Sequence, residues 1–381
     1  MTLLEILAMK IAPFETEHFF AEYEFNTPHQ LCNSDCETMT IGELLEMSGT
    51  SIEDFGKLSL GYTESQGHPE LRSALASGYN GPTADDFMIL GTPVEGIYLT
   101  ARALLEPDDE VIVLTPAYDA LLNVFEHVVG AGNVKKWELS PTEDSWSLDL
   151  ERLKALITDK TKLVVVNFPH NPTGFLPTPN WMNDLIGVIE ANDLWLFCDE
   201  MYFGLTHSGT APIPSAAELS KRAIVLSGLS KTYGLPGLRS GWLIIRDDDM
   251  RDIFMNWKFY TSICPPAPSE FLAIAAWKVR EKLRARSVRQ IEANLAIAEP
   301  FFERWPELFT FRKPVAGSVA LIDMQVPSVS KFAAKLAKSD GVLIQSGDTF
   351  GASDQTMRMG FGRAAFGEAL DKFDAALKNN A

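Results

Sequence analysis

Short runs of consecutive apolar residues divide the middle of the chain and predict buried strands. Runs of this kind occupy residues 87–90, 111–114, 163–166, 194–197 and 223–226. Because both faces of such a strand are apolar, each run is typical of a parallel sheet that helices cover on both sides. The stretches 94–105 and 120–129 between them predict amphipathic helices, so the pattern indicates an α/β fold.

The apolar run at 241–245 departs from this parallel pattern. It begins only ten residues after Lys231, which is too soon for a helical crossover, so we expect this strand to be antiparallel. From about residue 281 long charged helices take over, with short strands expected at 318–324 and 342–344. This part of the sequence predicts a smaller α+β domain.

The chain is long enough for two domains, because it has 381 residues and domains of about 100–200 residues are usual. The change of pattern indicates a boundary within the helical stretch 267–286. We therefore predict a large domain at 46–279 and a small domain built from 1–45 and 280–381.

Charge and cysteine content argue against several classes of function. The net charge is −18, and binding to nucleic acid requires clustered lysine and arginine instead. The cysteines have irregular spacing, so we expect no metal site and reduced thiols in a cytoplasmic protein. They are Cys32, Cys36, Cys198 and Cys264. The segment Met1–Ala8 lacks the basic start of a secretory signal, and no apolar run approaches the ~20 residues of a membrane helix.

Polar residues follow the carboxyl ends of the predicted strands, where open α/β sheets bind their ligands. They are Gly91, Thr92 and Pro93 after the first run, Tyr118 after the second, Asn171 after the third, Asp199 and Tyr202 after the fourth, and Ser230, Lys231 and Arg239 after the fifth. Lys231 lies among glycines behind a buried strand, unlike an ordinary surface lysine. Asp199 ends an apolar strand, where an unpaired carboxylate would be costly, although it could also cap a helix.

Four short motifs occur in order along these loops. They are Asn171-Pro172-Thr173-Gly174, Asp199-x-x-Tyr202, Ser230-Lys231 and Gly237-Leu238-Arg239-x-Gly241. This ordered set resembles the class I/II aminotransferase family, which depends on pyridoxal 5′-phosphate (PLP) and has fold type I. The resemblance extends from about residue 61 to 241 and reappears at Arg358. It implies a mostly parallel seven-stranded sheet sandwiched by helices, PLP as the cofactor, and an amino acid and a 2-oxo acid as substrates.

The resemblance also implies individual roles around the cofactor ring. The family lysine that matches Lys231 carries PLP as a Schiff base, and its freed amine then moves a proton on the substrate. Asp199 matches the aspartate beside the pyridine nitrogen, and Tyr118 matches the aromatic residue that stacks on the ring. Tyr202 and Asn171 match the pair that binds the phenolic oxygen, and Asn171 also borders the substrate. Catalytic roles are thus implied for Lys231, Asp199 and Tyr202.

The phosphate of PLP requires cations and amide donors. Arg239 lies eight residues after the lysine, the family's spacing for a phosphate-binding arginine. Thr92 is expected to open a helix whose N-terminus favours anions. Residues 92–95 are also a capping-box sequence, and the proline at the first helical position removes one amide donor. Gly228 stands where the family usually has serine or threonine, so Ser227 or Ser230 is expected to supply the hydroxyl that helps hold the phosphate.

Three further regions match the family. Tyr62 corresponds to a tyrosine that reaches the phosphate of the neighbouring subunit, so the resemblance implies a homodimer with shared active sites. Arg358 corresponds to the arginine that binds the substrate α-carboxylate. The segment 33–37 corresponds to one that closes over the site, and its acidic residues favour a basic or polar substrate.

The motifs leave other reactions open. The stretches 163–174 and 230–241 are also similar to capreomycidine synthase, a PLP enzyme that cyclises a hydroxylated arginine, so a PLP-dependent lyase or cyclase is the alternative to an aminotransferase. A non-catalytic PLP-binding regulator would need a DNA-binding domain, for which the chain has neither spare length nor positive charge. A nicotinamide dehydrogenase would need a G-x-G-x-x-G motif, which residues 91–96 do not supply.

Overall fold

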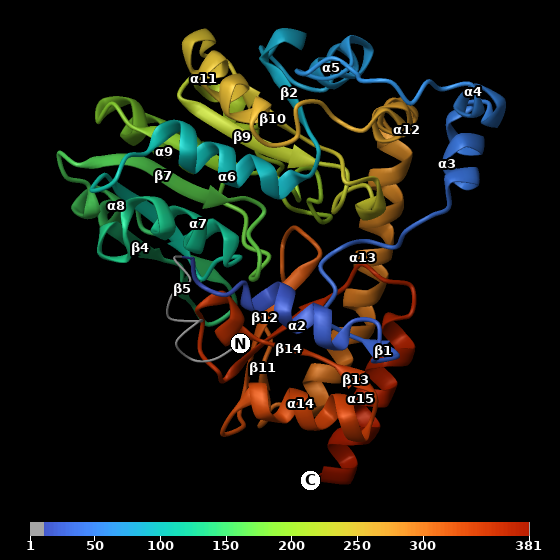
Figure 1. Ribbon diagram of the computed structural model, residues 1–381. Coiled ribbons are helices and arrows are strands. Elements are labelled where there is room, and N and C mark those ends of the chain that lie inside the picture. Colours follow the sequence, from blue (N-terminus) through green and yellow to red (C-terminus); the bar gives the residue numbers. More distant parts are fainter. Residues whose placement is uncertain (1–10, 381) are drawn as a thin grey trace, which may run out of the picture.

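A seven-stranded sheet forms the core of the larger part of the molecule (Figure 1). The computed structural model describes residues 11–380, so the segment Met1–Ala8 lies outside the described residues. In spatial order the strands are β2 (Phe87–Leu90), β10 (Gly241–Ile245), β9 (Ala223–Gly228), β8 (Trp195–Asp199), β7 (Thr161–Asn167), β3 (Glu110–Thr115) and β4 (Val134–Glu138). Strand β10 is antiparallel to β2 and β9, while the pairs from β9 to β4 are parallel. The predicted mixed sheet is confirmed.

Helices cover both faces of this sheet, which explains why its strands are apolar throughout. Neighbouring residues of β9 point into different cores: Val225 packs into one, and Ile224 and Leu226 into the other. One face carries α6 (Pro93–Leu104), α7 (Ala120–Val129) and α11 (Asp248–Phe259). The other carries α3 (Ile41–Ser48), α5 (Pro69–Ala76), α8 (Leu150–Leu156), α9 (Pro179–Ala191), α10 (Ala216–Leu219) and α12 (Ala267–Lys278).

Strand β4 was not predicted, because its sequence has no apolar run. It lies at the edge of the sheet, next to β3. Only Trp137 among its five residues is buried, and Lys135, Lys136 and Glu138 are partly or fully exposed. An edge strand with charged side chains is a common way to prevent pairing with other chains.

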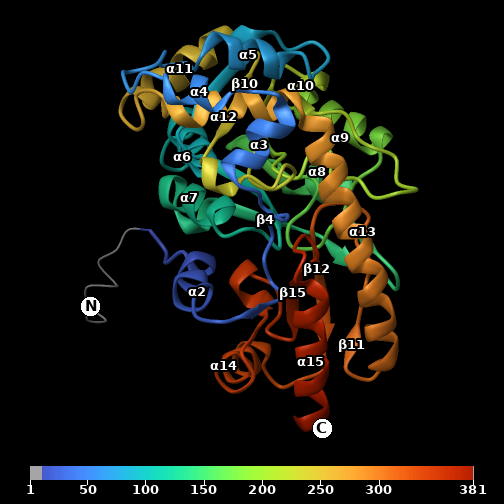
Figure 2. The same ribbon diagram turned by 90° about the vertical axis from the view of Figure 1, so that its right-hand side faces the viewer.

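The smaller part contains a four-stranded antiparallel sheet and long helices (Figure 2). Its strands, in spatial order, are β11 (Phe309–Thr310), β12 (Val319–Met324), β15 (Thr356–Gly360) and β14 (Gln345–Ser346). Its helices are α13 (Arg280–Arg304), α14 (Val329–Ser339) and α15 (Phe366–Asn380). Val279 separates α12 from α13, within the stretch expected to contain a boundary. The domain limits at 45/46 and 279/280 stay a prediction.

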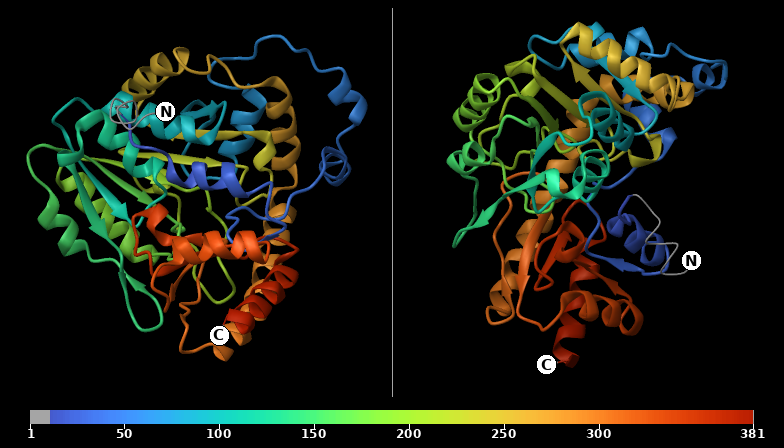
Figure 3. Two further views of the ribbon diagram at one scale, coloured as in Figure 1. Left: turned by 60° about the horizontal axis from the view of Figure 1, so that its bottom comes forward. Right: turned by 60° about the vertical axis from the view of Figure 1, so that its left-hand side comes forward.

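The N-terminal region contacts both parts. Helix α2 (Glu15–Tyr23) lies across the space between them, whereas α4 (Ile52–Gly56) projects from the larger part (Figures 1 and 3). Strand β1 (His29–Gln30) pairs with β13 (Val342–Leu343) of the smaller part. A minor hairpin joins β5 (Ser140–Pro141) and β6 (Trp146–Ser147).

Two glycines allow the chain after β1 to lie directly against β15. A Cβ atom on Gly360 would be 1.7 Å from the backbone oxygen of Asn33, and one on Gly362 would be 2.3 Å from that of Asp35. Any larger residue at these positions would push the N-terminal segment away. The backbone amide of Gly360 also donates a 2.7 Å hydrogen bond to the oxygen of Leu31.

Candidate active site

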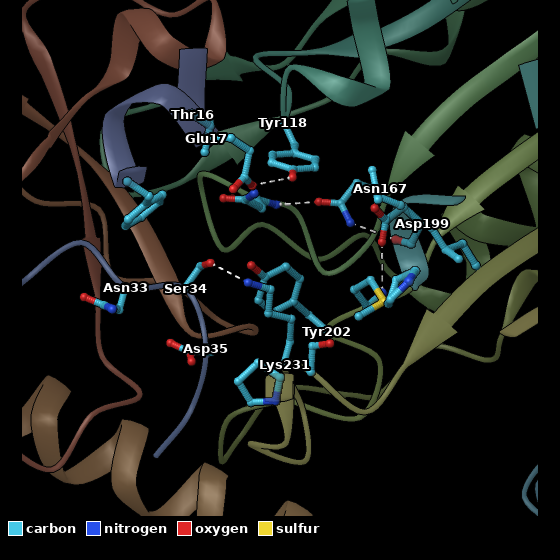
Figure 4. Close-up of a pocket in the computed structure, with 18 of the residues that line it drawn as sticks. Thr16, Glu17, Asn33, Ser34, Asp35, Tyr118, Asn167, Asp199, Tyr202 and Lys231 are labelled. Carbon is cyan, nitrogen blue, oxygen red and sulfur yellow. Dashed lines mark hydrogen bonds between the residues drawn. The ribbon is translucent and has the colours of Figure 1, made fainter. Parts of the chain in front are cut away.

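One cavity of about 310 Å³ collects most of the residues that the sequence singles out (Figure 4). It lies at the carboxyl ends of β7, β8 and β9, between the larger sheet, helix α2 and strand β15. The predicted site residues that line it are Pro93, Tyr118, Asn171, Asp199, Tyr202, Ser230, Lys231, Arg239 and Arg358. These side chains come from seven different segments of the chain, so the agreement is not a consequence of sequence proximity.

Lys231 lies in the turn after β9, and its amine projects into the cavity. Its Nζ donates a 2.7 Å hydrogen bond to Oγ of Ser34, as Figure 4 shows. The half-buried amine thus has a fixed position without an ion pair, which suits a lysine that must act as a nucleophile.

Asp199 ends β8 with a side chain that is only 6% exposed. Its Oδ1 accepts a 3.0 Å hydrogen bond from the amide of Met201. Burial is the main cause that raises the pKa of this carboxyl from 3.8 to about 6; the amide and the Lys231 charge oppose the shift.

Asn167 connects two of the predicted site residues. Its side-chain amide donates to the backbone oxygen of Asp199, and its Oδ1 accepts from the amide of Asn171. The sequence did not mark Asn167 as a site residue, although it lies four positions before Asn171, the first residue of the Asn-Pro motif.

Arg358 occupies the middle of the small sheet, where β15 pairs with β12 and β14. Its Nη1 donates to Oδ1 of Asn171 at 3.2 Å, and its Nη2 donates to the backbone oxygen of Cys32 at 2.8 Å. The side chain is 1% exposed, yet its Nε has no partner within the described residues. Its guanidinium lies 4.7 Å from the ring centre of Phe350. A buried guanidinium without a carboxylate partner is suited to bind an anionic ligand.

Arg239 lines the cavity and contacts Thr92, which is not among the lining residues. Nη2 of Arg239 donates a 2.7 Å hydrogen bond to Oγ1 of Thr92. The backbone of Arg239 has φ of 51°, in the left-handed region that costs energy for a residue other than glycine. Ser230 is 5% exposed, and its Oγ also lacks a partner within the described residues. These hydroxyl and guanidinium groups are the donors that a phosphate requires.

The capping box expected at residues 92–95 is not formed. Thr92 is the N-cap of α6 and Pro93 its first residue, as predicted, but the threonine side chain makes no cap hydrogen bond. Its hydroxyl is used by Arg239 instead. Glu95 accepts a 2.9 Å hydrogen bond from the amide of Gly91, so this amide is already bonded, and Gly91 is not among the residues that line the cavity.

Gly228, where the family usually has serine or threonine, lies in a tightly packed position. It pairs with Gly241 across the β9–β10 ladder. A Cβ atom here would be 3.0 Å from the oxygen of Ser240 and 3.1 Å from Cε of Met201. Serine in this position would therefore displace its neighbours. Ser230, which lines the cavity, is instead available to supply a hydroxyl.

Tyr202 and Tyr118 complete the lining from opposite sides of the cavity. Tyr202 is buried, 3% exposed. The hydroxyl of Tyr118 donates a 2.9 Å hydrogen bond to Oε1 of Glu17 on helix α2 (Figure 4). Burial, and next the Glu17 charge, raise the pKa of Tyr118 well above its usual value.

Helix α2 contributes lining residues that the sequence reasoning did not find. They are Thr16, Glu17, Phe20 and, directly after the helix, Glu24. No motif marks them, since their place depends on how the N-terminal helix packs against both parts of the molecule. The expected segment 33–37 does reach the cavity through Asn33, Ser34 and Asp35.

The acidic residues of segment 33–37 are already paired. Asp35 accepts two hydrogen bonds from Arg363, at 3.1 and 2.7 Å. The carboxylate of Glu37 accepts a 2.7 Å hydrogen bond from the amide of Ala364. Both carboxylates are therefore engaged by other parts of the protein, and the effect of this segment on substrate choice stays a prediction.

Tyr62 lies apart from this cavity, on the projecting region between α4 and α5. Its side chain is 91% exposed, and that of Leu60 is 85% exposed. Tyr260 and Ile263 are further large exposed apolar residues. The role of Tyr62 at a neighbouring subunit stays a prediction.

The groups in the cavity fit PLP. They include a primary amine, a buried carboxyl, an aromatic ring and phosphate donors with an unpaired buried hydroxyl at Ser230. Lys231 would hold the cofactor covalently, Asp199 would bind its ring nitrogen, and Arg239 with Ser230 would bind its phosphate. When bound, PLP stabilises the negative charge that develops at the substrate α-carbon.

No helix within residues 11–380 combines the length and apolar composition needed to cross a membrane. That part of the chain also contains no group of three or more His, Cys, Asp or Glu side chains arranged to hold a metal ion.

Comparison with known proteins agrees with this geometry. Capreomycidine synthase of Streptomyces vinaceus is 28% identical over 370 residues, which cover 93% of this chain and 90% of the relative. Aspartate aminotransferase of Bacillus sp. (strain YM-2) is 25% identical over 374 residues, 94% and 90% of the two chains. The structure of a PLP-dependent aminotransferase from Streptococcus suis 89-1591 superposes with a TM-score of 0.90 at 27% identity, covering 97% and 99%. That of the PLP-dependent cyclase OrfR gives a TM-score of 0.90 at 25% identity, covering 97% and 98%.

The family description "Aminotransferase class I and II" matches residues 31–372, which include both sheets and every lining residue except those of helix α2 and Glu24. The chain therefore belongs to the class I and II aminotransferase family, with PLP as its cofactor and the mostly parallel seven-stranded sheet of that family.

Proposed function

We propose that this protein is a PLP-dependent aminotransferase, which moves an amino group between an amino acid and a 2-oxo acid. The observation that carries the proposal is the convergence of three groups on one cavity: the amine of Lys231, the carboxyl of Asp199 and the guanidinium of Arg358. These are the groups needed to move a proton, to hold the cofactor ring nitrogen and to bind a carboxylate.

Each of these residues has a defined task in the proposal. Arg358 binds the α-carboxylate with its unpaired edge, while Asn171 orients the guanidinium from the other side. The amine of Lys231, once free of the cofactor, would be the base that removes the proton from the substrate α-carbon. Helix α2 lines one side of the cavity and would limit the access of water to the reacting atoms.

A spectroscopic half-reaction tests the proposal. Purified holoenzyme is mixed with single amino acids, and the absorbance of the cofactor is followed. An amino acid substrate should convert the cofactor to its amine form, and a 2-oxo acid should restore the aldehyde form. If ammonia or a cyclic product accumulates while the cofactor keeps its aldehyde oxidation state, transamination is not the reaction.

A PLP-dependent lyase or cyclase is the second candidate. It is favoured by the similarity to capreomycidine synthase and to the cyclase OrfR along almost the whole chain. Both reactions would use Lys231, Asp199 and Arg358 in the same way, so the product analysis described above distinguishes them.

We further propose a homodimer with shared active sites, based on Tyr62 and the exposed apolar residues around it. An exposed region with several large apolar side chains is typical of a protein interface. A cytoplasmic location also stays part of the proposal.

A further inference from the structure

Two carboxylates of the N-terminal region face the cavity without a cationic partner. Glu17 and Glu24 both line it. Within residues 11–380, neither forms an ion pair with lysine, arginine or histidine, although sixteen such pairs exist there, including the one between Asp35 and Arg363. Unpaired acids are common on a surface, but these two lie where a substrate must bind.

The two acids belong to one face of the helix, together with Phe20. Positions 17, 20 and 24 are spaced by three and four residues, so their side chains share a face. The ring of Phe20 lies 6.0 Å from the guanidinium of Arg358. The acidic face of α2 is therefore next to the arginine that is proposed to bind the α-carboxylate.

The other charged groups of the cavity already have partners or tasks. Lys231 bonds to Ser34, Arg239 to Thr92, and Asp35 to Arg363. Asp199 is proposed to bind the cofactor and Arg358 the α-carboxylate. No lining arginine or lysine is left for a second carboxylate on the substrate, and an acidic side chain would instead meet Glu17 and Glu24.

We propose that Glu17 and Glu24 select amino acids whose side chain carries a positive charge, such as a guanidinium or an ammonium group. This inference rests on the proposed function, because it takes the α-carboxylate to bind at Arg358. Tyr118 orients the carboxylate of Glu17 through its hydrogen bond to Oε1. Glu17 and Glu24 thus form the recognition site for the end of the substrate, and Phe20 packs along its apolar stem.

The electrostatic surroundings of Glu24 support this assignment. Burial, and then the negative charge of Asp35, raise the pKa of Glu24; the charge of Glu17 acts in the same direction, while the charges of Arg363 and Lys231 partly oppose the shift. Glu17 is exposed and Glu24 is half-buried, and two carboxylates that line one cavity are stabilised when a cation binds between them. The unpaired Oδ1 of Asn33, a buried residue that also lines the cavity, is a further acceptor for a ligand N–H group.

Binding of acids that cannot react tests the inference on the holoenzyme. We would compare desamino-arginine with desamino-citrulline, which has the same shape but a neutral urea group, and with adipate, which has a second carboxylate. None of them has an α-amine, so calorimetry reports binding alone. We expect desamino-arginine to bind about tenfold more tightly than desamino-citrulline, and adipate to bind most weakly.

Variants identify the residues responsible. Glu17→Gln and Glu24→Gln should each reduce the ratio of the desamino-arginine and desamino-citrulline affinities, and the double variant should bring it close to one. Glu24→Lys should shift the preference toward adipate. The matched control is Glu22→Gln, which removes the same charge from α2 but lines a different cavity, on the other side of the helix. It should leave the ratio unchanged.

The outcomes separate this inference from the proposed function. The selection of cationic side chains would be overturned by any of four results. These are an affinity ratio near one in the wild type, an unchanged ratio in the double variant, tighter binding of adipate than of desamino-arginine, and no binding of any of the three acids. If neutral amino acids react in the half-reaction while the ratio is near one, the aminotransferase proposal survives alone. If desamino-arginine is preferred but arginine gives no amine form of the cofactor, the substrate class survives and the reaction type does not.

Discussion

The amine of Lys231 and the hydroxyl of Ser34 are joined by a 2.7 Å hydrogen bond, although 197 positions separate them in the sequence. Ser34 belongs to the segment that lies against β15 of the smaller part, whereas Lys231 follows β9 of the larger sheet. The reactive amine is therefore held by a residue from the opposite wall of the cavity.

Replacement of Lys231 by alanine should abolish turnover and leave the protein folded, because the amine is required for chemistry and makes no structural ion pair. Borohydride reduction of the holoenzyme, followed by peptide mapping, should find the cofactor on Lys231. A label on Lys221 or Lys162 would refute the assignment. Ser34→Ala removes one hydrogen bond, worth about 1 kcal/mol, so turnover should fall only roughly fivefold.

Asp199 should make the cofactor-free protein less stable as the pH rises. Its folded pKa of about 6 exceeds the ordinary 3.8, so the stabilising contribution is complete below 3.8 and is lost as the pH rises through 6. Asp199→Asn mimics the protonated form. It should equal the wild type near pH 4 and exceed it above pH 6, by on the order of 3 kcal/mol in urea unfolding.

The control for this comparison is Asp184→Asn, an exposed position on α9. It should show the same stability difference from the wild type at both pH values. A constant difference for Asp199→Asn as well would mean that burial does not raise the pKa of this carboxyl.

Arg358→Ala should weaken the binding of amino acids far more than that of the corresponding amines. Loss of one partner from a buried charged pair costs about 2–5 kcal/mol, and only the amino acid supplies the carboxylate. Arg358→Lys keeps the charge but not the planar geometry, so its effect should be intermediate. The measurement is the concentration dependence of the absorbance change, with the surface variant Arg152→Ala as control. Equal losses for both ligand classes would contradict the assignment.

Gly228→Ser, which introduces the usual family residue, should destabilise this protein. A Cβ atom would lie only 3.0 Å from the oxygen of Ser240 and 3.1 Å from Cε of Met201, so these neighbours would have to shift, and overpacking of this kind costs about 1–3 kcal/mol in unfolding experiments. Addition of Met201→Ala should relieve only part of that cost, since the backbone oxygen remains. A serine variant with unchanged stability and tighter PLP retention would show that the strand can adjust.

Mixing Tyr62→Ala with Lys231→Ala chains tests whether active sites are shared. Each variant alone should be inactive or nearly so. If every site uses Tyr62 and Lys231 from different chains, random hybrids should recover about a quarter of wild-type activity, because half of the dimers contain one intact site. A monomer in light scattering, or no recovery in verified hybrids, would reject the composite site.

The sequence predicts the larger sheet well because its strands are buried on both faces. Their apolar runs lie within or next to β2, β3, β7, β8 and β9, and the short connection before β10 indicates its antiparallel direction. Strand β4 could not be found, since its position at the sheet edge lets polar residues alternate with Trp137. Local pattern thus reports burial more directly than it reports strand pairing.

The active-site residues likewise include some that the sequence predicts and some that it does not. Residues directly after strands, such as Lys231 and Asp199, are predictable because the strand ends meet at one edge. Glu17 and Glu24 are not, because their position depends on the packing of α2 over that edge. The capping sequence at Thr92 failed for a different reason. Its local pattern predicts that the threonine hydroxyl caps its own helix, but this hydroxyl instead accepts a hydrogen bond from Arg239, which is distant in the sequence.

The contact of residues 31–35 with β15 has a consequence for the order of folding. Arg358 and Arg363 bond to residues that are synthesised 326 and 328 positions earlier, and contacts across such separations form slowly. The N-terminal segment leaves the ribosome first but must wait for nearly the whole chain before Gly360 and Gly362 offer it a place. We therefore expect a nascent chain that ends before β15 to build much of the large sheet while the wall that receives the substrate is still missing.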